Sequence, residues 1–360
     1  MQKSKFIKEL KQPYPTEVFI DTIKGRHPAD ETIPVKGRWV WDSKRKYHYA
    51  PGLPFLKATA KLLFKKHKDK PYDGNVFCEF SAPKVLYGQN ISGILYEDRT
   101  ILYDKVKELL TVNGINIDLA EKAVDFRTFD VTRIDLSFSF FVKNDTEQKE
   151  FMRLFRNMYH PHLKPGKSGS RDYDYPNAFC FTSPKLDIVL YDKAKELNIK
   201  NVNLLRLEFK CKKTFKKDNA GSDFFDSFEN TMKKANKWLA NKLEYYNLSL
   251  PFLPEEEYFK AISACYISKK KEHDEKTEDS PLYLRHELST LIKTIKDINN
   301  KGCYNYHSLN RDMYNKCLHL AKDAGVQLLY TKLPYSISFT DNVCYHADAQ
   351  KIVEISSVPP

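Results

Sequence analysis

Several features that would point to a familiar class of protein are scarce or missing in this 360-residue sequence. It has only 12 glycines and no Walker-type phosphate loop, H-E-x-x-H motif or nucleophile elbow. A nucleoside-triphosphate site, a zinc protease site and a serine hydrolase site are therefore not indicated. No apolar run approaches the roughly 18 residues of a membrane span, and no signal-peptide pattern follows the basic N-terminus. We expect a cytoplasmic protein without membrane contact.

Cysteine offers no scaffold either. The seven cysteines are odd in number and widely spaced, and no C-x-x-C pair occurs. A disulfide framework or a structural zinc site is therefore not expected, which fits a reducing compartment. Positive charge, by contrast, is abundant, with a formal net charge of +12. This excess is either a solvated basic surface or a means of neutralising the phosphates of a polyanion, and composition leaves both open.

Hydrophobic periodicity predicts a mixed fold. Alternating apolar and polar residues predict strands over residues 17–23, 38–41, 75–80, 130–140, 178–182, 187–192 and 204–211. Apolar residues at helical spacing predict helices over residues 99–111, 146–159, 224–246, 282–299 and 309–324. Without regular βαβ units, the pattern predicts an α+β fold with an antiparallel sheet and flanking helices over residues 1–250. Residues 251–360 are predicted to be a smaller, mainly helical part, with a charge-rich linker over residues 269–280.

Two of the predicted strands carry a basic and an acidic residue two positions apart, and therefore on one face. Arg133 and Asp135 form one such pair, and Arg206 and Glu208 form the other. If the strands are neighbours, Asp135 and Glu208 can converge on a hard cation such as Mg²⁺ or Mn²⁺. The alternative is that each pair is an ion pair closing the sheet surface, because unpaired buried charges are costly.

A third segment places Tyr191 two residues before Lys193, so that both side chains face the same way near the end of a strand. A phenol is a poor nucleophile at its ordinary pKa of about 10. A neighbouring lysine and a metal that polarises a phosphate would make phosphoryl transfer to tyrosine feasible. The alternative is packing, since Tyr191 is one of 22 tyrosines.

The polar segments occur in a distinctive order. They are Ser81-Ala82-Pro83-Lys84-Val85-Leu86-Tyr87-Gly88-Gln89-Asn90, Thr132-Arg133-Ile134-Asp135, Tyr191-x-Lys193-x-x-Glu196 and Leu205-Arg206-Leu207-Glu208. In this order and spacing they resemble the gene II replication proteins of filamentous phages and, more distantly, the rolling-circle initiators of plasmids. The resemblance covers about residues 54–217, and it departs at Gln89, where the family has a histidine.

The resemblance implies a sheet platform of the rolling-circle initiator type and a metal-dependent, strand-specific nickase. Such an enzyme cuts one strand of a replication origin through a covalent 5′-phosphotyrosine, leaves a 3′-OH for a host polymerase, and later rejoins the ends without ATP. Tyr191 would be the nucleophile, and Lys193 would lie next to the scissile phosphate. Asp135 and Glu208 would hold Mg²⁺ or Mn²⁺. Glu196 and Glu79 are further candidate ligands, although Glu79 does not align cleanly with the family.

The expected partners are origin DNA, both single- and double-stranded, and a host helicase and polymerase in the bacterial cytoplasm. The residues expected to contact DNA are basic and lie on or beside the motifs, namely Lys84, Arg133, Arg206, Lys210, Lys212 and Lys213. An oligomer on DNA stays open. The region 251–360 could serve origin binding or oligomerisation.

A His160-Pro161-His162 segment looks like the paired histidine ligands of many rolling-circle nickases. That pair normally lies on a strand, whereas this one follows a predicted helix in a predicted loop, so we expect it to bind no metal. Two other functions remain as alternatives. One is a DNA-binding replication or copy-control protein that does not cut. The other is a structural or RNA-binding protein whose charged strand faces are only ion pairs.

Overall fold

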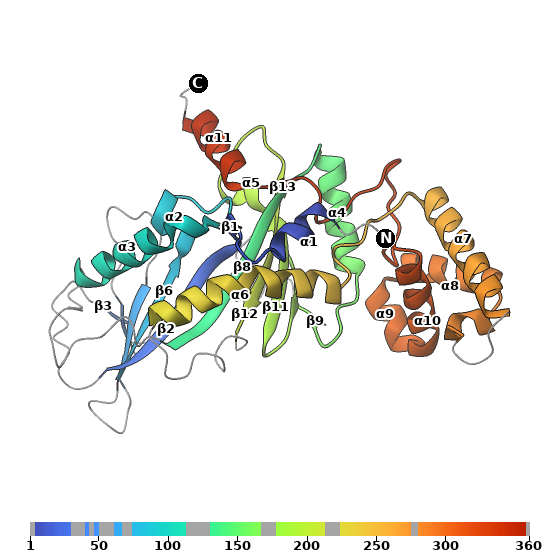
Figure 1. The fold of residues 1–360 in the computed structure, drawn as a ribbon, viewed down its shortest axis with the longest axis horizontal. Coiled ribbons are helices and arrows are strands. Elements are labelled where there is room, and N and C mark those ends of the chain that lie inside the picture. Colours follow the sequence, from blue (N-terminus) through green and yellow to red (C-terminus); the bar gives the residue numbers. More distant parts are fainter. Residues whose placement is uncertain are drawn as a thin grey trace.

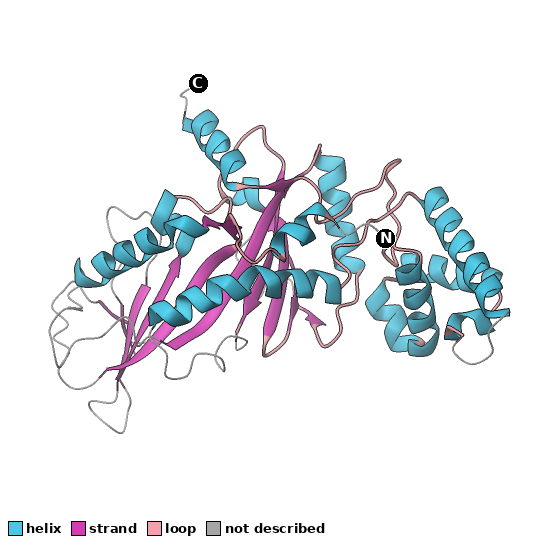
Figure 2. Ribbon diagram, viewed as in Figure 1, coloured by secondary structure: helices cyan, strands magenta, loops and turns pink. Residues whose placement is uncertain are grey.

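The computed structural model describes residues 4–29, 40–42, 47–49, 61–66, 74–112, 130–166, 178–212, 224–274 and 280–357. Within these residues the chain forms an 11-stranded antiparallel sheet, with most helices packed beside it or gathered at one end (Figures 1 and 2). The strand order is β3-β4-β5-β6-β2-β8-β12-β11-β10-β9, and β13 pairs separately with β8. The α+β class with a large antiparallel sheet is therefore confirmed.

The strands of this sheet are β2 Ile20–Ala29, β3 Val40–Asp42, β4 Tyr47–Tyr49, β5 Lys61–Lys66, β6 Gly74–Ser81, β8 Asp130–Phe141, β9 Lys164–Pro165, β10 Phe179–Thr182, β11 Leu186–Asp192, β12 Leu204–Cys211 and β13 Val343–Cys344. A small separate pair consists of β1 Glu17–Val18 and β7 Ile94–Leu95. The helices are α1 Lys5–Leu10, α2 Ala82–Tyr87, α3 Arg99–Val112, α4 Asp145–Asn157, α5 Lys193–Glu196, α6 Phe224–Tyr245, α7 Glu255–Asp274, α8 Leu288–Lys301, α9 Cys303–Leu309, α10 Arg311–Asp323 and α11 His346–Ser357. Two short 3-10 turns cover Tyr96–Asp98 and Leu282–Arg285.

Strand β8 is the centre of the sheet, and its two faces differ in character. One face carries the apolar set that the alternation predicts, Ile134, Leu136, Phe138 and Phe140, and all four are buried in the main core. Helices α1 and α6 run across this side (Figure 1). The ring of Phe138 lies 4.9 Å from that of Phe6 in α1. The opposite face of β8 is polar, and it is continued by polar residues of β11 and β12.

The helices α7 to α10 form a cluster beside the end of the sheet near α4 (Figure 1). The chain then returns to the sheet, because β13 pairs with β8 through Val343 and Cys344. Helix α11 follows, and its Ala349 and Ile352 pack against Ile91 and Ala194. A division into residues 1–250 and 251–360 remains a prediction, but the last part of the second region belongs to the sheet. Among the described helices, none is both long enough and apolar enough to cross a membrane.

Most predicted elements are confirmed to within one or two residues, whereas the predicted linker is largely wrong. Helix α7 continues through Lys269 to Asp274, and residues 275–279 lie outside the described part. Charge density misled the prediction. Lysine and glutamate favour helices and pair across a turn, as Lys269 and Glu272 do at 2.8 Å. The helix predicted over 282–299 is also interrupted. A 3-10 turn comes first, and α8 begins only at Leu288.

Candidate active site

Three polar side chains from adjacent strands form one row across the polar face of the sheet. Tyr191 of β11 lies opposite Arg206 of β12, and Arg206 lies opposite Ser139 of β8. Residues directly opposite in an antiparallel pair project to the same side, so the three side chains are neighbours. All are buried, with Tyr191 only 1% exposed and Arg206 fully enclosed. The row therefore places a phenol beside a permanent positive charge.

Arg206 is held by partners from several distant segments. Its guanidinium donates to the Asp21 carboxylate at 3.3 Å, to Ser139 Oγ at 3.2 Å, and to the backbone carbonyls of Asn90 and Ile91. Asp21 also accepts hydrogen bonds from Ser81 at 2.9 Å and from the Asn90 amide at 3.2 Å. Burial alone would raise the pKa of Asp21, but the charges of Arg206 and of nearby Lys193 hold that pKa below its ordinary value.

Lys193 begins helix α5 directly after the strand that carries Tyr191. Asp192 caps this helix by accepting a hydrogen bond from the Lys195 backbone N–H at 2.9 Å. The Lys193 ammonium is fully buried, donates to Asn90 Oδ1 at 2.8 Å and pairs with Glu196. It lies 5.9 Å from the centre of the Tyr191 ring.

Two positive charges are therefore buried close together, and this changes the proton affinity of the lysine. Burial is the main cause that lowers the pKa of Lys193, and the neighbouring charge of Arg206 lowers it further, whereas Glu196 and Asp21 oppose the shift. The resulting pKa is about 7. At neutral pH the amine is thus divided between its charged and neutral forms.

The loop that carries Asn90 and Ile91 is fixed by close backbone contact. A Cβ atom at Gly93 would come within 2.3 Å of the Val18 carbonyl oxygen, so only glycine fits between the loop and β1. The Gly93 N–H donates to the buried Glu17 carboxylate at 2.8 Å. At the other end of the loop, Gly88 ends α2 with a positive φ of 74°. These glycines set the position from which Asn90 reaches Lys193 and Arg206.

A second charged cluster lies further along the same face. Asp135 and Glu208 come from the adjacent strands β8 and β12, as the sequence predicts, with Glu208 opposite Ser137 and Lys210 opposite Asp135. Arg133 bonds both carboxylate oxygens of Asp135, one of them at 2.8 Å. The ion pair considered as the alternative interpretation is therefore present. Burial, together with the charge of Glu208 and against that of Arg133, raises the pKa of Asp135 to about 7.

These two carboxylates fit a divalent cation in part. Glu208 Oε2 is buried and has no hydrogen-bond partner within the described part of the chain, which is costly for a carboxylate unless a cation or proton is supplied. Mg²⁺ is often held by one or two carboxylates together with substrate phosphates. Over the same described ranges, however, no group of three or more histidine, cysteine, aspartate or glutamate side chains is gathered for a metal ion.

The four expected ligands are therefore not brought together. Glu196 pairs with Lys193 at the other end of the face. Glu79, on β6, lies 3.0 Å from Lys24 and 3.6 Å from Arg133, so it belongs to the ion-pair cluster around Asp135. Only Asp135 and Glu208 remain as adjacent candidates.

The expected DNA contacts also separate into different groups. Arg206 is enclosed, so the expectation that it contacts DNA does not fit its burial. Lys210 lies 3.9 Å from Glu208, and Lys212 pairs with Asp187 at 2.7 Å. Arg133 is bound to Asp135, and Lys84 is half-buried in α2. Lys213 lies outside the described residues.

His160 lies in a loop, as expected, and is enclosed by the rings of Phe155, Phe181 and Tyr246 at 4.3 to 5.5 Å. Burial lowers its pKa to about 3, so the imidazole is neutral at neutral pH. His162 has a left-handed backbone, with φ of 65°. This arrangement supports a packing role for His160.

Sequence reasoning missed Asp21, Asn90 and Ser139 as members of the site. The available signals were a single aspartate inside the predicted strand 17–23 and the last residue of the Ser81–Asn90 segment. Neither signal identifies a partner, because Asp21 lies 185 residues from Arg206 along the chain.

Comparison with known proteins places this geometry in a family. A family model described as the N-terminal part of the gene II replication-associated protein matches residues 40–245, more than half of the chain. The chain belongs to this family of replication-associated proteins, which confirms the family inferred from the motifs. The matched residues run from β3 to the end of α6, and they include Tyr191, Arg206 and both carboxylates of the second cluster.

Other comparisons are distant. A solved rolling-circle replication initiator protein from Geobacillus stearothermophilus is 11% identical, with a TM-score of 0.30, over 63% of this chain and 84% of that one. A di-domain ARO/CYC protein, BexL of the BE-7585A biosynthetic pathway, is 10% identical, with a TM-score of 0.15, over 68% of this chain and 94% of that one. At these TM-scores neither likeness bears on the chemistry of this chain. No curated protein matches it.

Proposed function

We propose that this protein is a rolling-circle replication initiator that nicks one strand of origin DNA, with Tyr191 as the nucleophile. The observation that carries the proposal is the row in which Tyr191 faces Arg206, with Lys193 nearby, in a chain of the replication-associated family. A fixed guanidinium charge beside a phenol favours its ionised, nucleophilic form. Packing alone does not require two buried cations around one tyrosine, since each is costly to bury.

In the proposed reaction, Tyr191 Oη attacks the phosphorus of a DNA phosphodiester. The bond from phosphorus to the 3′ oxygen breaks, and a 5′-phosphotyrosine ester forms. The neutral amine of Lys193 accepts the phenolic proton, and that proton then passes to the departing 3′ oxygen. One phosphoester replaces another, so the DNA 3′-OH can later reverse the step and rejoin the strand without ATP.

The second cluster would support the same reaction from the neighbouring strands. Asp135 and Glu208 would hold Mg²⁺ or Mn²⁺, which when bound neutralises negative charge on the phosphate oxygens. Since Arg133 occupies both oxygens of Asp135, it would have to release that carboxylate. The released guanidinium would then be available to a DNA phosphate.

The burial of Tyr191 sets one condition for this function. At 1% exposure the phenol is not accessible to a DNA backbone, so DNA binding must displace part of its cover. The same burial favours the second candidate function, a replication protein that binds DNA without cutting it. Strand cleavage therefore decides between the two.

The deciding experiment uses supercoiled plasmid carrying the origin of the replicon that encodes this chain, with Mg²⁺, followed by a denaturing gel. Wild-type protein should yield nicked circles, and Tyr191→Phe should yield none. Tyr258→Phe is the matched control, because it also removes a buried hydroxyl, one that donates to the Leu328 carbonyl in the helical cluster. DNA binding without nicking by the wild type would favour the non-cleaving protein.

A further inference from the structure

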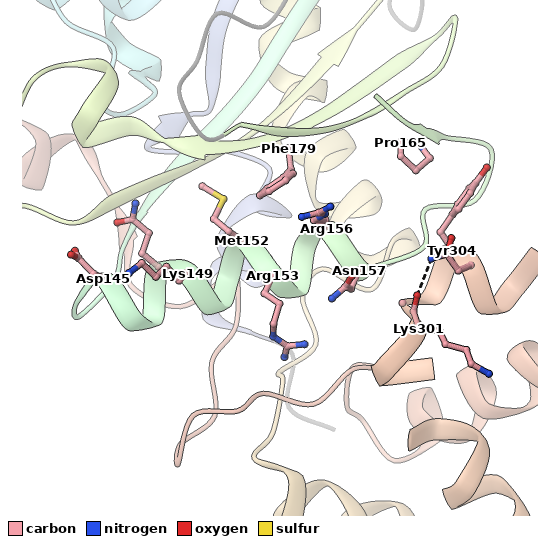
Figure 3. Close-up of a pocket in the computed structure, with 13 residues that line it drawn as sticks. Asp145, Lys149, Met152, Arg153, Arg156, Asn157, Pro165, Phe179, Lys301 and Tyr304 are labelled. Atoms are coloured by element: carbon pink, nitrogen blue, oxygen red, sulfur yellow. Dashed lines mark hydrogen bonds between the residues drawn. The ribbon is translucent and has the colours of Figure 1, made fainter. Parts of the chain in front are cut away.

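A cavity of about 730 Å³ lies where the sheet region meets the helical cluster. Helix α4 forms one wall, β9 and β10 contribute Pro165 and Phe179, and the junction of α8 and α9 contributes Lys301 and Tyr304 (Figure 3). This volume falls within the range of about 300–1,000 Å³ that small ligands or single residues of a polymer occupy. None of the roles considered for the polar sheet face uses this cavity.

The lining is strongly basic. Lys149, Arg153, Arg156 and Lys301 contribute four positive charges, against one carboxylate from Asp145. Arg153 is already engaged by Glu150, with two bonds of 2.7 Å. Lys149 and Arg156 are exposed, and neither makes an ion pair with a residue in the described part of the chain. These two cations are therefore available to an anionic ligand.

Aromatic rings accompany the cations. The Arg156 guanidinium lies 5.5 Å from the centre of the Phe179 ring, and Figure 3 shows the two side chains together. Tyr304 is 37% exposed and lies 6.2 Å from the ring of Tyr159, which itself stacks on His307 at 4.0 Å. Basic side chains that track phosphates beside rings that stack on bases are the usual means of binding single-stranded nucleic acid. Paired bases in a duplex would not present their faces to these rings.

The cavity is connected to the candidate nucleophile by a single side chain. Gln148 of α4 lines the cavity and donates to the carboxylate of Asp192 at 2.7 Å. Asp192 follows Tyr191 in the chain and caps the helix that begins with Lys193. A strand that passes through the cavity would thus run next to the end of β11, where the proposed chemistry takes place.

We propose that this cavity binds a segment of single-stranded DNA flanking the nick. The inference rests on the proposed function for its biological setting, but the binding itself does not require cleavage. Lys149 and Arg156 would contact phosphates, and Tyr304 and Phe179 would stack on bases. Because such contacts do not read base edges, the site would accept any sequence.

Fluorescence anisotropy with a labelled oligothymidylate of about 20 nucleotides tests this. The double variant Lys149→Ala/Arg156→Ala should raise the Kd at least about tenfold. It should also flatten the slope of log K against log salt by about 1.4, which corresponds to two lost phosphate contacts. Tyr304→Ala should weaken binding about fivefold or more, through lost stacking. Lys270→Ala/Lys271→Ala, which removes two exposed charges from α7 outside the cavity, should change neither quantity.

Equal Kd values for the wild type and the Lys149→Ala/Arg156→Ala variant would overturn the inference. So would an equal loss of affinity for duplex of the same length, or displacement of the oligonucleotide by free thymidine monophosphate at similar concentration. The outcomes for the two proposals are separable. If the wild type nicks but binding ignores the cavity, the proposed function stands and this inference fails. If binding depends on the cavity but no nick forms, the inference stands and the proposed function fails.

Discussion

Asp21 and Arg206 form a buried ion pair beside Tyr191, and replacement of Asp21 by asparagine tests what holds the candidate active site together. Asparagine keeps the shape of the side chain but removes the charge that faces Arg206 at 3.3 Å. Because the guanidinium is fully enclosed, water cannot replace the lost partner. Removing one member of such a pair costs about 3–5 kcal/mol, most of it from the uncompensated buried charge. We expect Asp21→Asn to lower the free energy of unfolding by this amount.

Urea unfolding followed by circular dichroism measures the effect. Asp104→Asn, on the exposed side of α3, is the matched control and should change stability by less than about 0.5 kcal/mol. The pKa of Asp21 is lowered in the folded protein, so its contribution is complete above the ordinary value of 3.8 and disappears only at lower pH. The loss should therefore be the same at all pH values from about 5 to 8.

A second variant separates charge from packing. Asp21→Asn/Arg206→Met removes both charges and should recover part of the loss, since a buried pair can often be replaced by apolar groups at little cost. A cost below about 1 kcal/mol for Asp21→Asn would refute the reasoning. So would a double variant whose loss equals the sum of the two single losses.

Three further outcomes are expected. With the pKa of Lys193 at about 7, nicking should rise with a midpoint near pH 7 as the amine loses its proton, whereas Lys193→Arg should be slow at every pH; a flat wild-type profile would contradict the proton transfer. His160→Phe should raise the free energy of unfolding by about 1–3 kcal/mol in urea titrations, because both buried ring nitrogens lack hydrogen-bond partners among the described residues. It should also remove the stability lost between about pH 6.5 and pH 3, where only unfolded His160 binds a proton, and a less stable variant would count against this account. Asp135→Ala and Glu208→Ala should abolish nicking while oligonucleotide anisotropy still shows binding, and full activity in Mg²⁺ would remove the tested residue from the metal site.

The sequence was sufficient to predict the strands that carry the chemistry, because their alternation is strict. Residues 204–211 form β12 as predicted, and their period of two puts Arg206 and Glu208 on the polar face. The antiparallel pairing of β8, β12 and β11 then brings Tyr191 beside Arg206. This is the part of the site that local pattern determines.

The partners of these residues could not be predicted in the same way, since they depend on contacts between segments far apart in the chain. Asn90 reaches Arg206 across 116 residues, from a loop whose path depends on the close approach of Gly93 to β1. The pairing of Glu196 with Lys193, rather than with Asp135 and Glu208, follows from the turn into α5, which moves it away from the strand face. The basic cavity likewise combines α4 with the α8–α9 junction, which no local pattern connects.

The most direct test of the central claim is identification of the residue that becomes linked to DNA. Wild-type protein is incubated with origin DNA and Mg²⁺, the covalent complex is isolated under denaturing conditions, and protease and nuclease digestion leave a nucleotide-bearing peptide for mass spectrometry. We predict a single adduct on Tyr191, joined through a 5′ phosphate. An adduct on another of the 22 tyrosines, or nicked DNA with no adduct at all, would contradict this assignment.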